Sequence, residues 1–278
     1  MHINAFFEGG GILGISFIGA YKALTDHGIY IDKALGISSG AIIASLIIAR
    51  YSPNELISLL NKYQDFAFLK PKTKIAMKNY IGKPLSLLIK KGIYDSLAIE
   101  KFVSNLLALK QIITFKDIAF GNNYNLKIVA YDFTAKRRLI FPDDLPSYGY
   151  DPKTFKIAKA IRMSCSIPFF YTPYELKVNN NIHYIIDGGV LKNVPTSLIS
   201  NPKQLTFRFH INGIKSKLRR KLIIDNKEED IENHLLINIP IDNKIKSTDF
   251  SISHDKIVYL FKQGYISCYK FLKKIGIT

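Results

Sequence analysis

Residues Ile31–Arg50 read IDKALGISSGAIIASLIIAR. The stretch opens with Ile31–Leu35, a short apolar segment that predicts a strand. It closes with Ala41–Arg50, a run of apolar residues and good helix formers that predicts a helix. Between them stands Gly36-Ile37-Ser38-Ser39-Gly40, which fits the pattern G-x-S-x-G. The sequence therefore predicts a sharp strand-to-helix turn with a serine at its centre.

A serine on such a turn is typical of a nucleophile elbow. The turn lifts the hydroxyl clear of the sheet, and the following helix points its N-terminal N–H groups at a developing oxyanion. A side chain in place of Gly36 or Gly40 would crowd the turn. We therefore expect Ser38 to be a nucleophile. The alternative is a turn of small residues that contains a serine by chance.

A second glycine-rich turn follows the apolar segment Ile3–Phe7, in the sequence GGGILG at 9–14. Gly9, Gly11 and Gly14 fit G-x-G-x-x-G, the dinucleotide fingerprint, which would make the chain a nucleotide-binding oxidoreductase. That interpretation requires an acidic residue at the end of the second strand, where this chain has Leu35-Gly36. The other interpretation is an oxyanion hole made of consecutive glycine N–H groups. We favour the oxyanion hole, because the serine turn occupies the place of the ribose-binding acid.

Strands and helices alternate from the first residues onward, which predicts an α/β protein with a mostly parallel sheet covered by helices. We expect further strands at 126–131, 138–141, 182–186, 205–211 and 235–239. The expected helices are 15–27, 53–63, 96–109, 157–166 and 255–274. No linker or internal repeat interrupts the chain, so we expect one domain over 1–278. Its motif-bearing core covers about 3–212, and a C-terminal strand and helix follow within about 235–274.

The composition is that of a globular, strongly basic protein. Hydrophobic residues make up 47% of the 278 residues, which excludes a disordered chain. Lys and Arg number 39 against 22 Asp and Glu, a net charge of +17 that favours an anionic membrane, an acidic substrate or nucleic acid as partner. A non-catalytic basic protein that binds membranes or nucleic acid is thus a further alternative. No helix-turn-helix, zinc or single-strand-binding motif supports nucleic acid, so we expect no such partner.

The cysteines and the apolar segments indicate where in the cell the protein is expected. Two cysteines, Cys165 and Cys268, imply no disulfide framework and favour a reducing compartment. The N-terminal residues lack the basic and apolar regions of a secretory signal. The longest apolar run, Ala41–Ala49, is far shorter than the ~20 residues that cross a bilayer. We expect a cytoplasmic or peripheral membrane protein.

A nucleophilic serine needs a base, and the local sequence does not identify one. None of the six histidines stands in a recognisable catalytic setting. Among those after Asp187, His210 is the most credible member of a triad, because it ends a predicted strand. Asp187 itself ends a predicted strand and precedes two glycines, which leaves room around its carboxylate. Asp-Gly after an apolar strand is also a common hairpin signal, and the local sequence alone favours the hairpin.

The motifs together resemble those of the patatin-like phospholipases. GGGILG at 9–14, GISSG at 36–40 and DGG at 187–189 occur in that family's order and approximate spacing. The resemblance extends to FEGGG at 7–11, YDSLAIEKF at 94–102, AIRMSCSIPFFY at 160–171, DGGVLKNVP at 187–195 and QGY at 263–265. It therefore covers nearly the whole chain and implies a patatin-like three-layer α/β/α sandwich.

The resemblance also implies an activity and a set of site residues. It implies a lipid acyl hydrolase of the phospholipase A type, with Ser38 as nucleophile and Asp187 as base. It implies an oxyanion hole from the N–H groups of Gly10 and Gly11, and it calls for no metal and no cofactor. The motif glycines are Gly9, Gly14, Gly36, Gly40, Gly188 and Gly189.

Two further points concern the substrate. Many family members carry Arg or Lys just before the last glycine of the first motif, where this chain has Leu13. The departure leaves catalysis by backbone donors untouched but removes a possible headgroup contact. Residues 65–92 combine seven lysines with aromatic and leucine side chains, so we expect them to form a membrane-contacting face or lid, or else a solvated insertion. The implied partners are an acyl-lipid substrate and an anionic membrane surface.

Overall fold

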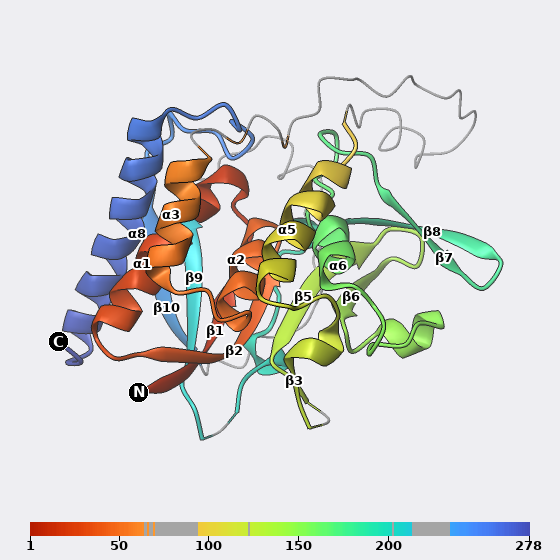
Figure 1. Ribbon diagram of the computed structural model, residues 1–278, viewed down its shortest axis with the longest axis horizontal. Coiled ribbons are helices and arrows are strands. Elements are labelled where there is room, and N and C mark those ends of the chain that lie inside the picture. The colour runs from red at the N-terminus through yellow and green to blue at the C-terminus, as the bar shows by residue number, and fades with distance from the viewer. Residues whose placement is uncertain (64–65, 67–68, 70–93, 122, 202, 213–233) are drawn as a thin grey trace.

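A computed structural model of the chain describes residues 1–63, 66, 69, 94–121, 123–201, 203–212 and 234–278 (Figure 1). Its centre is an eight-stranded sheet in the order β10-β9-β1-β2-β5-β8-β7, with β6 also paired to β5. The strands are β1 (His2–Phe7), β2 (Tyr30–Ile37), β5 (Leu126–Asp132), β6 (Arg137–Phe141), β7 (Tyr174–Val178), β8 (Asn181–Asp187), β9 (Thr206–Asn212) and β10 (His234–Pro240). Two short strands, β3 (Ala119–Phe120) and β4 (Asn123–Tyr124), pair separately.

The sheet has a parallel and an antiparallel half that meet at β5. β10, β9, β1, β2 and β5 run parallel to one another. β6 and β8 are both antiparallel to β5, and β7 is antiparallel to β8. The predicted α/β class with a mostly parallel sheet is confirmed.

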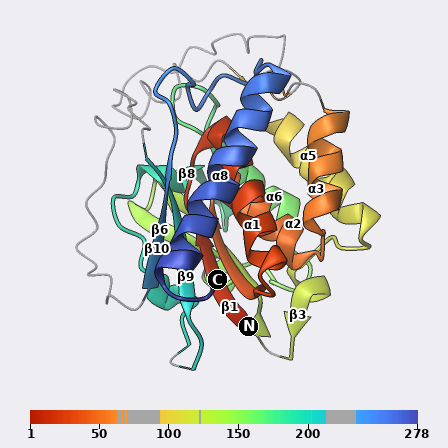
Figure 2. The ribbon, with the colours of Figure 1, turned by 90° about the vertical axis from the view of Figure 1, so that its left-hand side faces the viewer.

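The long helices lie over one face of this sheet (Figures 1 and 2). They are α1 (Ile15–Asp26), α2 (Ser39–Ile48), α3 (Pro53–Lys62), α5 (Leu97–Leu109), α6 (Ile157–Ser164) and α8 (His254–Lys274). α3 shows how local sequence sets a boundary: the Ser52 hydroxyl accepts from the Glu55 N–H, Glu55 accepts from the Ser52 N–H, and Pro53 takes the first helical position.

Helices α1 and α8 pack against each other without an intervening side chain at two positions. A Cβ at Gly19 would overlap the Phe261 carbonyl oxygen, and a Cβ at Gly264 would overlap the Ser16 carbonyl oxygen. Only glycine permits so close an approach of two backbones. The QGY motif at 263–265 therefore has a packing role in this fold.

Strand alternation divides the core into two clusters. On β5, Leu126, Ile128 and Ala130 face the helices, whereas Val129 and Tyr131 face the other side. Within the described residues, the second face is covered by the segment after β8, which contains the short 3-10 helices η5 (Gly188–Val190) and η6 (Thr196–Leu198).

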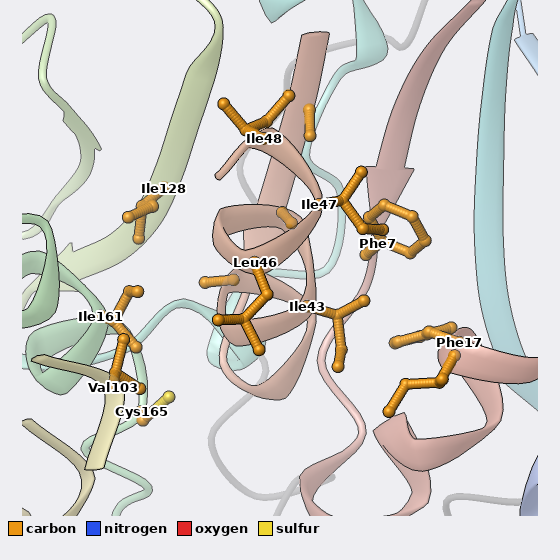
Figure 3. Packing of buried hydrophobic residues seen from close by; sticks show 14 of the residues in the cluster. Phe7, Phe17, Ile43, Leu46, Ile47, Ile48, Val103, Ile128, Ile161 and Cys165 are labelled. Atoms are coloured by element: carbon orange, nitrogen blue, oxygen red, sulfur yellow. The ribbon is translucent and has the colours of Figure 1, made fainter. Parts of the chain in front are cut away.

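Helix α2 lies at the centre of the larger cluster (Figure 3). Phe7 and Phe17 lie on one side of it, and Ile128, Ile161 and Val103 lie on the other. Because α2 is apolar all round, it is buried on nearly every side. None of the helices in the described part of the chain is both long and apolar enough to span a membrane.

Most predicted elements agree with the structure to within a few residues. The 126–131 and 138–141 segments form an antiparallel pair, β5 and β6. The strand β7 was not predicted, although Glu175 and Lys177 alternate with apolar residues as in a half-buried strand. The lysine-rich segment 65–92 lies almost entirely outside the described residues. Of this segment only Phe66 and Leu69 are described, and both are buried.

Candidate active site

Ser38 occupies the turn between β2 and α2, in a strained backbone conformation. Its φ and ψ angles are 55° and −126°, a region that costs a non-glycine residue about 1–3 kcal/mol. A side chain at either flanking glycine would crowd the turn, as expected from the sequence. A Cβ at Gly36 would overlap the Ala41 Cα, and one at Gly40 would overlap the Phe7 carbonyl oxygen. The local geometry is that of a nucleophile elbow.

The glycine loop lies directly beside this turn. A Cβ at Gly9 would come within 3.3 Å of the Ser38 Cβ. The Gly10 N–H donates to the Ser39 Oγ at 3.1 Å. Gly11 has a φ of +56°, and a Cβ there would overlap the Ser247 carbonyl oxygen. The loop therefore presents backbone amides next to Ser38.

The approach of Ser247 to the glycine loop argues against a dinucleotide site. The Ser247 carbonyl oxygen accepts from the Ile12 N–H at 2.9 Å and fills the space that the absent Gly11 side chain leaves open. In a dinucleotide site, the pyrophosphate makes this close approach. A carbonyl oxygen there would repel phosphate instead of binding it.

The register of β5 brings Asp187 to the same place as Ser38. β5 pairs with β2 up to Val129 and with β8 from Ala130 onward. Because β6 pairs with residues of both groups, β2 and β8 share the opposite edge of β5, one after the other. Ile37 pairs with Val129, and Asp187 pairs with Ala130. Ser38, which follows Ile37, and Asp187 are therefore neighbours along that edge.

Asp187 does not begin a hairpin, so the interpretation that the local sequence favoured is wrong. Its Oδ1 accepts from the Gly189 N–H at 2.7 Å and caps the short helix η5. Its own N–H donates to the Ser166 carbonyl at 3.0 Å. Gly188 must lack a side chain because a Cβ there would lie 2.5 Å from the Val129 carbonyl oxygen. The carboxylate is buried, with 5% of the residue exposed.

Cys165 lies beside both Ser38 and Asp187. Burial raises the pKa of its thiol well above the usual value, the negative charge of Asp187 raises it further, and a hydrogen bond with Ser38 opposes them. The thiol therefore stays protonated, as expected of a small buried core residue and not of a reactive thiol. One sulfur atom thus lies within interaction distance of both candidate catalytic side chains.

An apolar cavity opens at Ser38. It encloses about 820 Å³, its open mouth included, and lies among α1, α2, α3 and α5. Along α2 it extends from Ser39 to Leu46, roughly 10 Å at the helical rise per residue. Its walls are almost entirely aliphatic and aromatic, among them Ile43, Leu46, Leu56, Leu60, Phe102 and Leu106.

His210, the histidine that a triad would use, is paired elsewhere. Its Nδ1 lies 2.6 Å from Glu8 Oε2, and Arg208 Nε donates to Glu8 Oε1 at 2.6 Å. Burial raises the pKa of Glu8, but the hydrogen bond from His210 and the charge of Arg208 outweigh it and hold that pKa below its usual value. His183 is likewise bonded to Asp132, at 2.6 Å. Neither histidine is paired with Asp187.

The sequence did not reveal Glu8, Arg208 and Ser164 as neighbours of the site. Glu8 precedes the glycines, but only the pairing of β1 with β9 brings Arg208 alongside it. Ser164 is 126 positions from Ser38 in the sequence, and no local pattern indicates that the two residues are in contact. In the part of the chain that the structure describes, no group of His, Cys, Asp and Glu side chains could hold a metal ion.

A family model described as patatin-like phospholipase matches residues 6–199, a range that contains the glycine loop, Ser38 and Asp187. The chain belongs to the patatin-like phospholipase family. Among relatives of this patatin-like chain, the uncharacterized protein YqhO of Bacillus subtilis is 31% identical over 299 aligned positions that cover 99% of each chain. The "Probable lipid hydrolase 463L" of Invertebrate iridescent virus 6 is 30% identical over 69% of this chain and 61% of its own.

A solved structure shares the patatin-like fold. VipD from Legionella pneumophila matches with a TM-score of 0.60 and 15% identity, over 98% of this chain and 67% of its own. At this identity the match concerns the fold alone. Together with the family model, it confirms the patatin-like fold that the motifs predicted.

Proposed function

We propose that this protein is a lipid acyl hydrolase in which Ser38 and Asp187 form a catalytic dyad. The observation that carries the proposal is the register of β5, which makes the two residues neighbours on one edge, together with the apolar cavity that Ser38 lines. Membership of the patatin-like phospholipase family supports lipid ester hydrolysis as the reaction class.

The reaction proceeds in two steps. The Ser38 Oγ attacks the ester carbonyl carbon while Asp187 takes the hydroxyl proton, and the alcohol part of the lipid leaves with that proton as the C–O bond breaks. Water then attacks the acyl-serine ester, gives its proton to Asp187 and releases the fatty acid, and Ser38 recovers its proton. No metal or cofactor takes part in this scheme.

An aspartate with an ordinary pKa of ~3.9 is a weak base for a hydroxyl, so the transition state needs strong electrostatic stabilisation. In this proposal the N–H groups of Gly10 and Gly11, in the loop beside Ser38, and the N-terminus of α2 supply it. One oxyanion donor is typically worth about 3–4 kcal/mol. The Gly10 N–H, bonded to Ser39 at rest, would exchange that partner for the oxyanion.

The cavity argues for a fatty acyl chain as the part of the substrate that binds beside Ser38. Burial of methylene groups stabilises binding by about 0.8 kcal/mol each, and the walls offer an acyl chain little else to contact. The net charge of +17 suits contact with an anionic membrane, where each Lys or Arg near the surface adds about 1 kcal/mol.

Hydrolysis of p-nitrophenyl esters with acetyl, butyryl and octanoyl chains tests the proposal. We expect kcat/KM to rise with chain length, and Ser38→Ala to abolish turnover with the fold intact. Ser45→Ala is the matched control, because Ser45 is a buried serine of α2 whose hydroxyl, among the residues that the structure describes, donates to the Ile42 carbonyl of its own helix. Near-normal turnover by Ser38→Ala would refute the nucleophile assignment. A kcat/KM that does not rise with acyl chain length would refute the proposal that the cavity binds the acyl chain.

A further inference from the structure

Three consecutive residues at the end of α6 contact both halves of the proposed dyad. Ser164 bonds the backbone of Ser38, Cys165 lies beside the side chains of Ser38 and Asp187, and Ser166 accepts the Asp187 N–H. These residues belong to neither the glycine loop nor the elbow. Through these contacts, the three residues can fix the position of Ser38 relative to Asp187.

The Ser164 hydroxyl bridges two backbone groups at the point where β2 leaves the sheet. It accepts from the Ser38 N–H at 2.9 Å and donates to the Val129 carbonyl at 2.6 Å. Val129 is the last β5 residue to pair with β2. The hydroxyl thus continues the link between the two strands one residue beyond their ladder. Ser164 is fully buried, so water cannot take over either bond.

The same carbonyl ties the bridge to Asp187. The Val129 oxygen lies against Gly188, where a Cβ would approach it to 2.5 Å. The Ser166 carbonyl holds the Asp187 N–H from the other side. A shift of the Ser164–Ser166 segment would therefore move Ser38 and Asp187 relative to each other.

The segment is itself anchored to α5 and to the two residues before it. The Arg162 guanidinium donates to Asp95 at 2.7 Å, to Glu100 at 2.9 Å and to the Ser96 hydroxyl at 3.2 Å. The Ser166 hydroxyl donates to the Arg162 carbonyl at 2.9 Å. The Ser164 hydroxyl therefore belongs to a segment that these hydrogen bonds hold in place, as a positioning group requires.

We infer that Ser164 is a positioning residue of the hydrolase: its hydroxyl holds the strained backbone of Ser38 so that the nucleophile faces Asp187 and the ester carbonyl. The inference rests on the proposed function. Ser38 adopts a conformation that few residues adopt unaided, and Ser164 is the side chain bonded to its N–H. Because Ser164 does not line the cavity, its loss affects the chemical step and not substrate binding.

The test compares Ser164→Ala, Ser164→Thr and Ser45→Ala with the wild type on p-nitrophenyl octanoate. We expect Ser164→Ala to lower kcat by about 10- to 100-fold with KM within twofold, the effect of a small misplacement of reacting groups. Ser164→Thr keeps the hydroxyl and is expected to restore kcat to within about threefold of the wild type. Ser45→Ala leaves both constants unchanged. The rate of Ser38 labelling by a fluorophosphonate falls in parallel with kcat.

Each outcome decides between the inference and its alternatives. A Ser164→Ala enzyme with wild-type kcat and labelling rate overturns the positioning role, and so does a loss confined to KM. A loss of thermal stability with unchanged kcat assigns Ser164 to folding alone. If Ser164→Ala does not fold, Ser164→Cys replaces it, and equal kcat for Ser164→Cys and Ser164→Thr overturns the role. A wild-type protein that neither hydrolyses esters nor reacts with fluorophosphonate refutes the proposed function itself.

Discussion

The parallel and antiparallel halves of the sheet contribute to the candidate site in different ways. The parallel half supplies the glycine loop after β1, the turn after β2 that carries the Ser38 hydroxyl, and the N-terminus of α2. The antiparallel half supplies a side chain, the Asp187 carboxylate at the end of β8. In the first half, local sequence fixes geometry through glycines. In the second, the position of the carboxylate depends on which residues of β5 pair with β8.

The largest expected effect comes from removing the charge that the antiparallel half supplies. If Asp187 is itself the base, Asp187→Asn lowers kcat about as much as Ser38→Ala, by roughly 10⁴-fold. The measurement is kcat on p-nitrophenyl octanoate, together with the melting temperature.

Asp132→Asn is the matched control for Asp187→Asn. Asp132 is a fully buried carboxylate of the same half, but its partners are Tyr148, His183 and the Ala135 N–H. We expect this variant to lose thermal stability and to keep kcat within about tenfold of the wild type, since it is not in the reaction path. An Asp187→Asn enzyme that kept most of its activity would leave the antiparallel half without a catalytic role.

An intermediate effect is expected from the parallel half. Gly11→Ala puts a Cβ into the Ser247 carbonyl and requires a φ of +56°, so we expect kcat to fall about 10²–10³-fold, as for loss of an oxyanion donor. The melting temperature falls as well, because Ser247 must move. The comparison variant is Gly10→Ala, whose Cβ would come too close to the flexible end of Ile211, at 2.6 Å, but to no backbone atom within 3.4 Å. Equal kcat for Gly11→Ala and the wild type would remove the glycine loop from the mechanism.

The smallest effect is expected from the histidines, which distinguish a dyad from a triad. His210→Ala and His183→Ala should each lower kcat less than about tenfold, and the pH–rate profile should lack a rise near about 6.5. A folded histidine variant without activity would establish a triad.

His210→Ala also has a predicted effect on acid stability. Because the pKa of Glu8 is lower in the folded protein than its ordinary value of 4.5, the ionised carboxylate stabilises the fold at pH values above 4.5. This contribution is lost as the pH falls through the folded-state pKa. Removing the His210 hydrogen bond raises that folded-state pKa. Acid unfolding, followed by circular dichroism, should therefore begin at a higher pH in His210→Ala than in the wild type.

The two halves also differ in how far the sequence predicted them. The elbow around Ser38 could be identified because a strand, two glycines and a helix follow one another within twenty residues, and each leaves a local signal. The local sequence at Asp187 favoured a hairpin, because an Asp-Gly pair looks the same before a turn and before a 3-10 helix. Only the resemblance to a family assigned Asp187 a role.

Long-range contacts explain what the sequence could not predict. The Ser164 bridge joins residues 126 positions apart, and the Glu8–Arg208 pair spans 200. Side chains that meet through sheet register leave no periodic pattern in the chain. The second face of the sheet was also unpredictable, since its short 3-10 helices have no helical periodicity to recognise.

The glycine contact between α1 and α8 has a consequence for the protein while it is being made. α1 follows the glycine loop and leaves the ribosome early, whereas Gly264 is added after β9 and β10. A nascent chain that stops short of residue 254 carries Ser38 and Asp187 but lacks the helix against which α1 packs. Without that contact, α1 and the loop at its N-terminus are held less firmly, although Ile12 and Gly10 keep their bonds to Ser247 and Ser39. Full activity of the proposed hydrolase is therefore expected only after translation has reached α8.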